Sequence, residues 1–393
     1  MRILFFDWVS FADIDMAEAM RRLGHEILIS DIQSDKKDVD EDYTLQCMKL
    51  FSENNVELVY TCNFAPTVAE ACHRANIPYM SWVYDSPQVL LYHKTILYPT
   101  NYVFLFDSAQ YIDLKSKGVD TVYFMPLAAN VERVDEIAYD SENEKRFSCD
   151  VAFVGSLYNE EHNFFDRMDD KLSDYDRGYL EALMEAQMKV YGYYFIEDVL
   201  RGQDILGRVK KILPYNMGPS YFCTDEYLCG DYFLGRKLTS NERIRILKEL
   251  GKRYNTNVYS TGDLSDIKGV NDMDVVEYFD EMPQAFRYAK INLNITLRTI
   301  RNGIPLRCFD IMGAGGFLLT NYQADFNGMF EDGIDYVSYE SHEDMYAKID
   351  YYLAHEEERK AIAKHGHDTV KQYHNYNVRI KEMFEVLKNA RGS

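Results

Sequence analysis

Residues 2–30 read RILFFDWVSFADIDMAEAMRRLGHEILIS. The stretch starts with an apolar run at 3–6, continues with a helical pattern at about 15–23, stops at Gly24 and returns to an apolar run at 27–29. Short apolar strands separated by helices indicate a parallel sheet that is covered on both faces. This β-α-β start predicts an α/β fold.

The same alternation continues along the chain in two series. Further apolar runs of the first series lie at 58–60, 79–82, 103–105 and 122–124, and those of the second lie at 151–155, 258–259, 291–295, 317–319 and 336–337. We therefore predict two Rossmann-like domains. The expected boundaries are 1–139 for the first domain, 140–149 for a polar linker, 150–375 for the second domain with a helical insertion at 160–236, and 376–393 for a C-terminal helix.

Composition limits the partners and the location. The 393 residues include 43 basic and 64 acidic ones, which gives a net charge of −21. A chain this acidic is unsuited to nucleic acid or to an anionic membrane surface, although one nucleotide could still find a local basic site. Seven cysteines form no CxxC pair, no leader is visible, and no apolar run reaches the roughly 20 residues that span a bilayer. We expect a cytoplasmic protein with no integral membrane segment and no metal site.

Nucleotide motifs of the common kinds are missing. A dinucleotide-binding domain carries G-x-G-x-x-G directly after its first strand. Residues 7–12 read DWVSFA and contain no glycine, and no P-loop pattern occurs elsewhere. The sequence therefore argues against a dehydrogenase built on the first domain.

The second domain carries the stronger candidates. Gly155 and Ser156 follow a strand, at the end where open α/β sheets bind ligands, although a routine turn would look the same. Arg307 and Asp310 share one face of a helix start, which fits either a surface ion pair or an arginine on phosphate beside an aspartate on ribose. Arg298, after the strand at 291–295, is a second candidate phosphate cation.

Several segments then carry a resemblance to a known family. They are LNI at 293–295, RCFDIMGAGG at 307–316, TNY at 320–322, DYVSY at 335–339 and EERKAIAKHG at 357–366, with WVYDSP at 82–87, FD at 106–107 and MPLA at 125–128 in the N-terminal half. In order and spacing they resemble the CgeB-type, spore-maturation-like glycosyltransferases, which are relatives of the family 4 nucleotide-sugar transferases. The likeness spans nearly the whole chain except 160–236.

The resemblance implies a GT-B fold, in which two Rossmann-like domains face a central cleft. It implies an acceptor on the first domain and a nucleotide-sugar donor, most simply linked to UDP, on the second. No cofactor or metal is implied, because helix N-termini and basic side chains neutralise the diphosphate. The expected donor-binding residues are Gly155, Ser156, Asn294, Arg298, Arg307, Asp310, Gly315, Gly316 and Asn321.

The sequence departs from the family 4 pattern at two places. Of two glutamates that flank the donor in those relatives, the second matches Asp310, whereas the first falls at Asn302. The basic residues that follow the glycine turn are also missing, because 157–162 reads LYNEEH. Arg298, Arg307 and backbone N–H groups would then have to meet the phosphate charge.

Asp85 is the catalytic candidate. Relatives place a His-Asp pair near this position, where this chain has Tyr84 and Asp85. In an inverting enzyme Asp85 would be the general base for the acceptor hydroxyl, and in a retaining enzyme it would hold acceptor or sugar hydroxyls. A simple capping aspartate is the alternative.

We therefore expect a glycosyltransferase that moves a sugar from a nucleoside diphosphate to a carbohydrate, protein or small-molecule acceptor. Two alternatives remain open at this stage. One is a non-catalytic carbohydrate-binding or surface-associated homologue of the same fold, and the other is a nucleotide-sugar epimerase.

Overall fold

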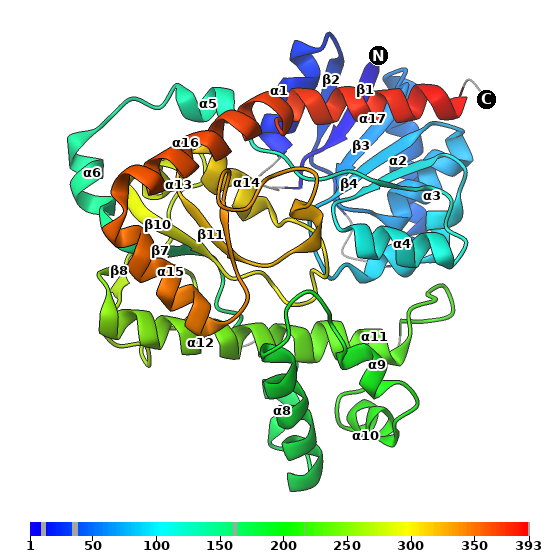
Figure 1. The fold of residues 1–393 in the computed structure, drawn as a ribbon. Coiled ribbons are helices and arrows are strands. Elements are labelled where there is room, and N and C mark those ends of the chain that lie inside the picture. The colour runs from blue at the N-terminus through cyan, green and yellow to red at the C-terminus, as the bar shows by residue number, and fades with distance from the viewer. Residues whose placement is uncertain (9–12, 34–37, 160–162, 216, 392–393) are drawn as a thin grey trace. The chain divides into compact units, whose positions relative to one another are not determined.

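The chain forms two α/β units in the computed structural model, which describes residues 1–8, 13–33, 38–159, 163–215 and 217–391 (Figure 1). The first unit comprises 1–128, 217–223 and 374–393, and the second comprises 129–216 and 224–373. Each unit is built around a six-stranded sheet, and the strand pairs within both sheets are parallel. The predicted α/β fold with two Rossmann-like sheets is confirmed.

The first sheet has the strand order β2-β1-β3-β4-β5-β6. Every residue of β3, β4 and β5 is buried, as expected for strands covered on both faces. The strands are β1 (Arg2–Phe6), β2 (Glu26–Ser30), β3 (Leu58–Cys62), β4 (Tyr79–Val83), β5 (Asn101–Leu105) and β6 (Val122–Phe124).

Helices of the first unit begin and end as their sequences dictate. Pro66 occupies the first turn of α3, where its missing N–H leaves no hydrogen bond unmade, and Asn76 ends that helix in the left-handed conformation. The helices are α1 (Asp13–Arg22), α2 (Glu41–Glu53), α3 (Pro66–Ala75), α4 (Ser108–Ser116) and α17 (Tyr376–Arg391), with 3-10 turns η1 (Val89–Tyr92) and η2 (Lys94–Leu97).

Two segments distant in sequence complete the first unit. Helix α17 packs on α1, and its Phe384 stacks on His25, which follows α1, with ring centroids 4.4 Å apart. Residues 217–223 also belong here, because the Lys94 N–H donates to the Ser220 carbonyl at 2.8 Å and the Phe222 N–H donates to the Tyr92 carbonyl at 2.9 Å. The insertion predicted at 160–236 within the second domain therefore contributes residues 217–223 to the first unit.

The second sheet has the order β12-β11-β10-β7-β8-β9. Apolar side chains of α12 and α15 pack on one face in a single buried core with the strands, while α13 and α14 contact β10. The strands are β7 (Cys149–Val154), β8 (Thr256–Tyr259), β9 (Asn271–Asp272), β10 (Ala289–Asn294), β11 (Leu318–Asn321) and β12 (Val337–Tyr339). The helices named here are α12 (Arg236–Arg253), α13 (Glu281–Tyr288), α14 (Leu306–Gly313) and α15 (His342–Ala354).

The expected linker at 140–149 contains a helix. Asp140 accepts a hydrogen bond from the Glu142 N–H at 2.8 Å and so caps α6 (Ser141–Phe147). This helix packs on α13, where Asn143 donates to Gln284 at 3.0 Å. Neighbouring elements of the unit are α5 (Val131–Asp135), the 3-10 turn η4 (Ala324–Phe326) and α16 (Glu356–Tyr373).

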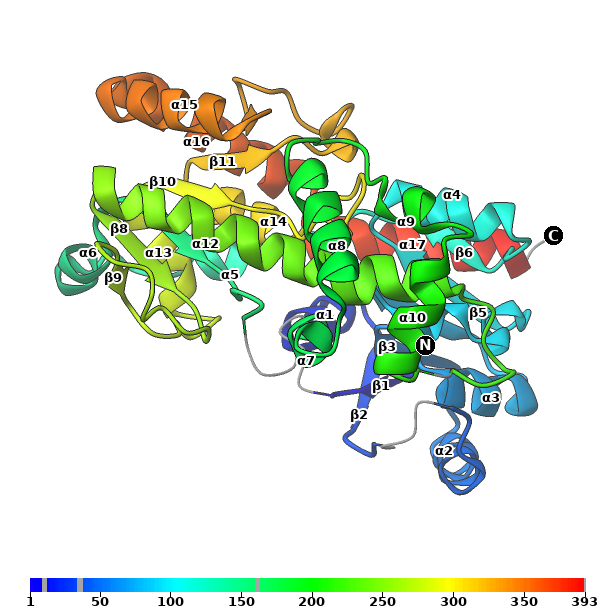
Figure 2. The ribbon, with the colours of Figure 1, turned by 90° about the horizontal axis from the view of Figure 1, so that it is seen from below.

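The described part of the expected insertion is helical. Its helices share a buried core of their own, to which Leu180, Ile196 and Phe233 belong. Figure 1 shows α8 extending from α12, and Figure 2 shows α8 to α10 beside that helix. The elements are α7 (Asp166–Asp169), α8 (Asp174–Met188), α9 (Ile196–Leu200), α10 (Asp204–Ile212), α11 (Asp225–Tyr227) and the π-helix η3 (Leu228–Gly235).

Candidate functional site

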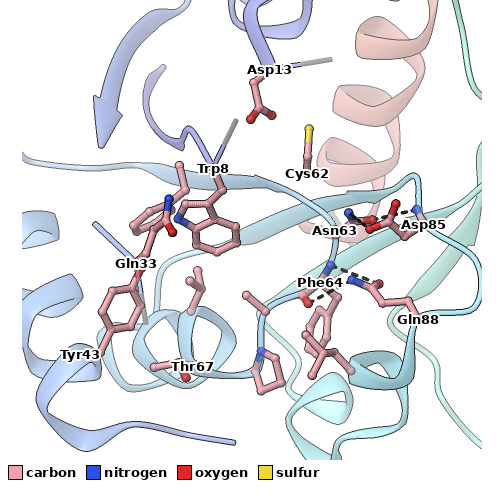
Figure 3. Close-up of a pocket in the computed structure, with 15 residues that line it drawn as sticks. Trp8, Asp13, Gln33, Tyr43, Cys62, Asn63, Phe64, Thr67, Asp85 and Gln88 are labelled. Carbon is pink, nitrogen blue, oxygen red and sulfur yellow. Dashed lines mark hydrogen bonds between the residues drawn. The ribbon is translucent and has the colours of Figure 1, made fainter. Parts of the chain in front are cut away.

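The first sheet has a pocket where its strand order reverses. The chain runs from β1 outward to β2 and then returns to place β3 on the other side of β1, so the carboxyl ends of β1 and β3 flank an open crevice. A pocket of about 390 Å³ lies there, lined by Phe6 at the end of β1, by Trp8, by residues 62–68, and by Asp85 after β4 (Figure 3). Its size and position are those of a small-molecule site.

Aromatic side chains of this pocket are held in place by one carbonyl. The Trp8 Nε1–H donates to the Ile32 carbonyl at 3.0 Å, and the Tyr43 hydroxyl donates to the same oxygen at 2.8 Å. Trp8 also lies against Phe6, with ring centroids 5.5 Å apart. The pocket therefore has a rigid aromatic wall.

Asp85, the catalytic candidate, lies at the opposite side of the pocket in Figure 3. Asn63 fixes it: the Asn63 side-chain amide donates to Asp85 Oδ2 at 2.9 Å, and its Oδ1 accepts the N–H groups of Tyr84 and Asp85 at 2.9 and 3.0 Å. Asn63 itself has a positive φ of 66°, a conformation that asparagine tolerates. Sequence reasoning missed this partner, whose only signal is an asparagine directly after a strand.

The pocket is acidic along its described lining. Asp13, in the first turn of α1 and 2% exposed, and Asp85 both line it, and no described lining residue carries a positive charge. In Figure 3 the Asp13 carboxylate points toward the same space as the Cys62 sulfur.

The second sheet also reverses its strand order, between β7 and β10. Gly155 and Ser156 lie directly after β7, as the sequence predicts, and the Gly155 N–H donates to the Tyr259 carbonyl at 3.0 Å. They therefore sit at the carboxyl edge of the sheet, where ligands of such folds bind.

A buried arginine connects the loops after β7 and β10, which flank the point where the strand order of the second sheet reverses. Arg243, from α12 and 7% exposed, donates its Nε–H to the Ile295 carbonyl at 3.1 Å and an Nη–H to the Ser156 carbonyl at 2.5 Å. Its guanidinium lies 4.9 Å from the centre of the Tyr158 ring. Sequence reasoning missed this cation, because α12 is more than 80 residues from the turn that it supports.

Asn294 and Asn321 end neighbouring strands at the same edge. The Asn294 amide donates to the hydroxyls of Thr296 and Thr320, both at 2.9 Å, and Asn321 Oδ1 accepts the Thr296 N–H at 2.8 Å. Both side chains are at most 5% exposed. They shape the loop after β10, and their predicted contact with a donor stays a prediction.

Arg298 forms a buried ion pair. Its Nε–H donates to Glu242 Oε2 at 2.7 Å and an Nη–H donates to Oε1 at 2.6 Å, and the guanidinium lies 3.8 Å from the centre of the Tyr191 ring. Glu242 also accepts the Tyr191 hydroxyl at 2.8 Å. Although burial opposes ionisation, Arg298, His342 and Tyr191 together lower the Glu242 pKa to about 2. Arg298, which the sequence predicts to bind a phosphate, is thus paired with a buried carboxylate of the protein itself.

Arg307 and Asp310 lie together at the start of α14, as their spacing predicts. An Arg307 Nη–H donates to Asp310 Oδ2 at 3.2 Å, and the Tyr278 hydroxyl donates to Oδ1 at 3.2 Å. The Arg307 side chain is 28% exposed and that of Asp310 is 8% exposed. Because α14 follows β10, this helix start faces the carboxyl edge of the sheet. Tyr278 is a further residue that sequence reasoning missed.

Gly315 and Gly316 lie at the other end of α14, before β11 begins. Gly315 ends the helix with φ +77°, and the Gly316 N–H donates to the Ile311 carbonyl at 2.9 Å. A Cβ on Gly316 would stand 2.9 Å from the Phe286 carbonyl oxygen. Helix capping and close packing explain both glycines, and their position at the amino-terminal end of β11 separates them from Gly155 and Asn321.

Gly316→Ala is expected to lower the free energy of unfolding by about 1–3 kcal/mol, since the added methyl group has to displace backbone. Urea unfolding followed by circular dichroism measures this. Gly178→Ala is the matched control, because no atom lies within 4 Å of a Cβ at that position of α8. Equal stability of wild type and Gly316→Ala would contradict the packing role.

The described part of the chain has neither a metal-binding cluster nor a membrane-spanning helix. No group of three or more histidine, cysteine, aspartate or glutamate side chains there has the arrangement of a metal site. Within the same residues, no helix is both long and apolar enough to cross a bilayer. The absence of a metal requirement stays a prediction.

Comparison with known proteins shows which families and solved structures the chain resembles. Residues 239–385 match the family model described as "Glycosyl transferase-like". Over 99% of this chain and 98% of the other, the structure is similar to a glycosyltransferase from Rickettsia africae ESF-5, with 14% identity and a TM-score of 0.52. No curated protein matches the sequence.

Two further solved structures share the fold. Anabaena Alr3699/HepE in complex with UDP-glucose is 9% identical with a TM-score of 0.57, covering 99% of this chain and all of the other. Sucrose-phosphate synthase from Thermosynechococcus elongatus is 9% identical with a TM-score of 0.54, covering 100% and 99%. With its two parallel six-stranded sheets, the chain has the GT-B glycosyltransferase fold. The finer CgeB-type assignment stays a prediction.

Proposed function

We propose that this protein is a glycosyltransferase that takes a sugar from a UDP-sugar and transfers it to an acceptor hydroxyl. The observation that carries the proposal is the pair Arg307 and Asp310 at the start of α14. A guanidinium suits a phosphate, and a carboxylate with two oxygens suits the ribose hydroxyls. Anabaena HepE, which has the same fold, was crystallised with UDP-glucose.

The surroundings of this pair support the assignment. Tyr278 holds one oxygen of Asp310, so the carboxylate is oriented before a ligand arrives. The fixed charge of Arg243 and the N-terminus of α14 add positive potential at the same edge of the sheet. These groups would meet the diphosphate charge without a metal ion or a cofactor. We assign acceptor binding to the pocket of the first unit, with Asp85 beside the reacting hydroxyl.

UDP binding tests the donor site. UDP at about 100 times its Kd is expected to stabilise the protein by about 2.7 kcal/mol, which raises Tm by several degrees. Arg307→Ala and Asp310→Ala should remove most of this shift. Glu249→Ala is the control, because Glu249 forms an exposed pair with Lys252 at 3.0 Å on α12. An undiminished shift in both site variants would refute the donor site.

Turnover distinguishes an enzyme from the two alternatives. A transferase hydrolyses its donor slowly and transfers the sugar when an acceptor is supplied, so products from a set of nucleotide-sugars would be identified by mass spectrometry. A binding homologue would turn over none of them, and an epimerase would release a changed sugar nucleotide without an acceptor.

All seven cysteines are free thiols, which supports our proposal of a cytoplasmic location.

A further inference from the structure

We propose that the helical insertion helps to shape the donor site around Arg307 and Asp310, and that Tyr191 is the positioning residue through which it acts. Tyr191 lies in the loop between α8 and α9, within the second unit. This inference gives the insertion a role in binding the donor, and it rests on the proposed function.

The loop after β10 lies at the carboxyl edge of the second sheet and leads directly to the donor pair on α14. Residues 295–305 form neither helix nor strand. Because such a segment has no backbone ladder, side chains from elsewhere have to hold it in one conformation. Gln323 does so at one point, since its amide donates to the carbonyls of Ile300 and Gly303 at 3.1 and 2.9 Å. Arg298, itself a residue of this loop, provides another anchor.

The carboxyl end of α8 holds the Arg298 guanidinium. One Nη–H donates to the Met188 carbonyl at 3.0 Å, and another donates to the Val190 carbonyl at 3.3 Å. The last carbonyls of a helix lack partners within it and carry the negative end of its dipole, so a cation is favoured there. The last turn of α8 contains no basic residue of its own. Arg298 therefore fastens the loop after β10 to the insertion.

Tyr191 contacts both members of the buried ion pair. Its ring centre lies 3.8 Å from the Arg298 guanidinium, and its hydroxyl donates to Glu242 Oε1 at 2.8 Å. The ring also meets that of Tyr339 in β12 edge to face, with centroids 5.8 Å apart. Burial and the Glu242 carboxylate raise the pKa of Tyr191, so its hydroxyl stays a donor at neutral pH. Tyr191 thus restricts the side chain that anchors the loop.

The residue after Tyr191 brings the insertion close to the end of β11. Gly192 has φ +76°, and a Cβ at this position would stand 3.1 Å from Tyr322 Cε1. Tyr322 follows Asn321, whose Oδ1 accepts the Thr296 N–H of the loop after β10 at 2.8 Å. The connection between α8 and α9 therefore packs on a second segment that borders the same loop.

UDP binding by Tyr191 variants of the full-length protein tests this role, with isothermal titration calorimetry as the measurement. Tyr191→Ala removes the ring and the hydroxyl, and we expect it to raise the Kd of UDP about tenfold. Tyr191→Phe keeps the ring against the guanidinium and should stay within about threefold of the wild type. Gly192→Ala should weaken UDP binding in the same direction as Tyr191→Ala, because its methyl group crowds the Tyr322 ring.

A destabilised insertion with an intact Arg298 site is the matched control. Ile205 is 3% exposed on α10 and belongs to the core of the insertion. Ile205→Ala should lower stability substantially but leave the Kd of UDP within about twofold of the wild type. Calorimetry also separates the two effects, because unfolded protein lowers the binding stoichiometry, whereas a displaced loop raises Kd at unchanged stoichiometry. Circular dichroism and Tm would verify that each variant is folded at the temperature of the titration.

A Kd for Tyr191→Ala within twofold of the wild-type value would overturn the inference. An equal rise in Kd for Ile205→Ala would also overturn it, since the effect would then come from the stability of the insertion as a whole. Failure of the wild type to bind UDP would remove the proposed function and this inference together. A wild type that binds UDP, with Tyr191→Ala unaffected, would keep the donor site and lose only the role of the insertion.

Discussion

Asp85→Asn is expected to lower the rate of sugar transfer by about 10²–10⁴-fold, the contribution typical of a positioned general base. Asparagine has nearly the same shape as aspartate and can still bond Asn63, but it cannot accept the proton of an acceptor hydroxyl. The thermal shift produced by UDP should be unchanged, because Asp85 lies in the first unit and the donor residues lie in the second. Transfer would be measured as UDP release with the acceptor at saturation.

Asp120→Asn is the control for this experiment, since the Asp120 carboxylate is fully exposed on the first unit. Its rate should equal that of the wild type. If Asp85→Asn transferred sugar within about threefold of the wild-type rate, the carboxylate would not act as a base. Asp85 would then hold hydroxyls, as expected for a retaining enzyme.

Arg298→Ala is expected to lower the free energy of unfolding by about 3–5 kcal/mol, because it leaves Glu242 buried without its cation. The two side chains are 6% and 0% exposed, so water cannot replace the lost partner. Urea unfolding followed by far-UV circular dichroism is the suitable measurement.

The exposed arginine Arg253, which pairs with Glu249 at 2.7 Å, provides the control, and Arg253→Ala should change stability by less than about 1 kcal/mol. The wild-type ion pair also predicts a pH dependence. The Glu242 pKa is lowered from 4.5 to about 2, so its contribution to stability is complete above pH 4.5 and decreases as the pH falls toward 2. An Arg298→Ala protein of wild-type stability that failed to bind UDP would instead support the donor role predicted from the sequence.

Much of the fold could be predicted because its strands are short apolar runs. The run at 79–82 became β4 (Tyr79–Val83), and the helix expected at 306–313 is α14 (Leu306–Gly313). The helix inside 140–149, where charged residues suggested a linker, could not be predicted. The polar face of α6 is stabilised by its cap at Asp140 and by contacts with α13, 140 residues later in the chain, which no local pattern reveals.

Some residues of the candidate site could likewise be predicted from local patterns, whereas others could not. Asp85, Arg307 and Asp310 could be found because each stands at the end of a recognisable strand or the start of a helix. Asn63 and Tyr278, which orient Asp85 and Asp310, could not, because each comes from a segment more than 20 residues away. The ion pair of Arg298 could not be predicted for a similar reason. Its partner Glu242 lies 56 residues earlier, on α12.

The anchoring of Arg243 has an entropic consequence. Flexible surface arginines lose side-chain freedom when they close on an anion, and that loss reduces affinity by about 0.5–1.5 kcal/mol for each side chain. Arg243 has already lost this freedom on folding, because carbonyls of the loops after β7 and β10 hold its guanidinium. The acidic chain therefore holds one positive charge in a fixed position near the carboxyl edge of the second sheet. A ligand that binds at this edge does not have to immobilise the Arg243 side chain.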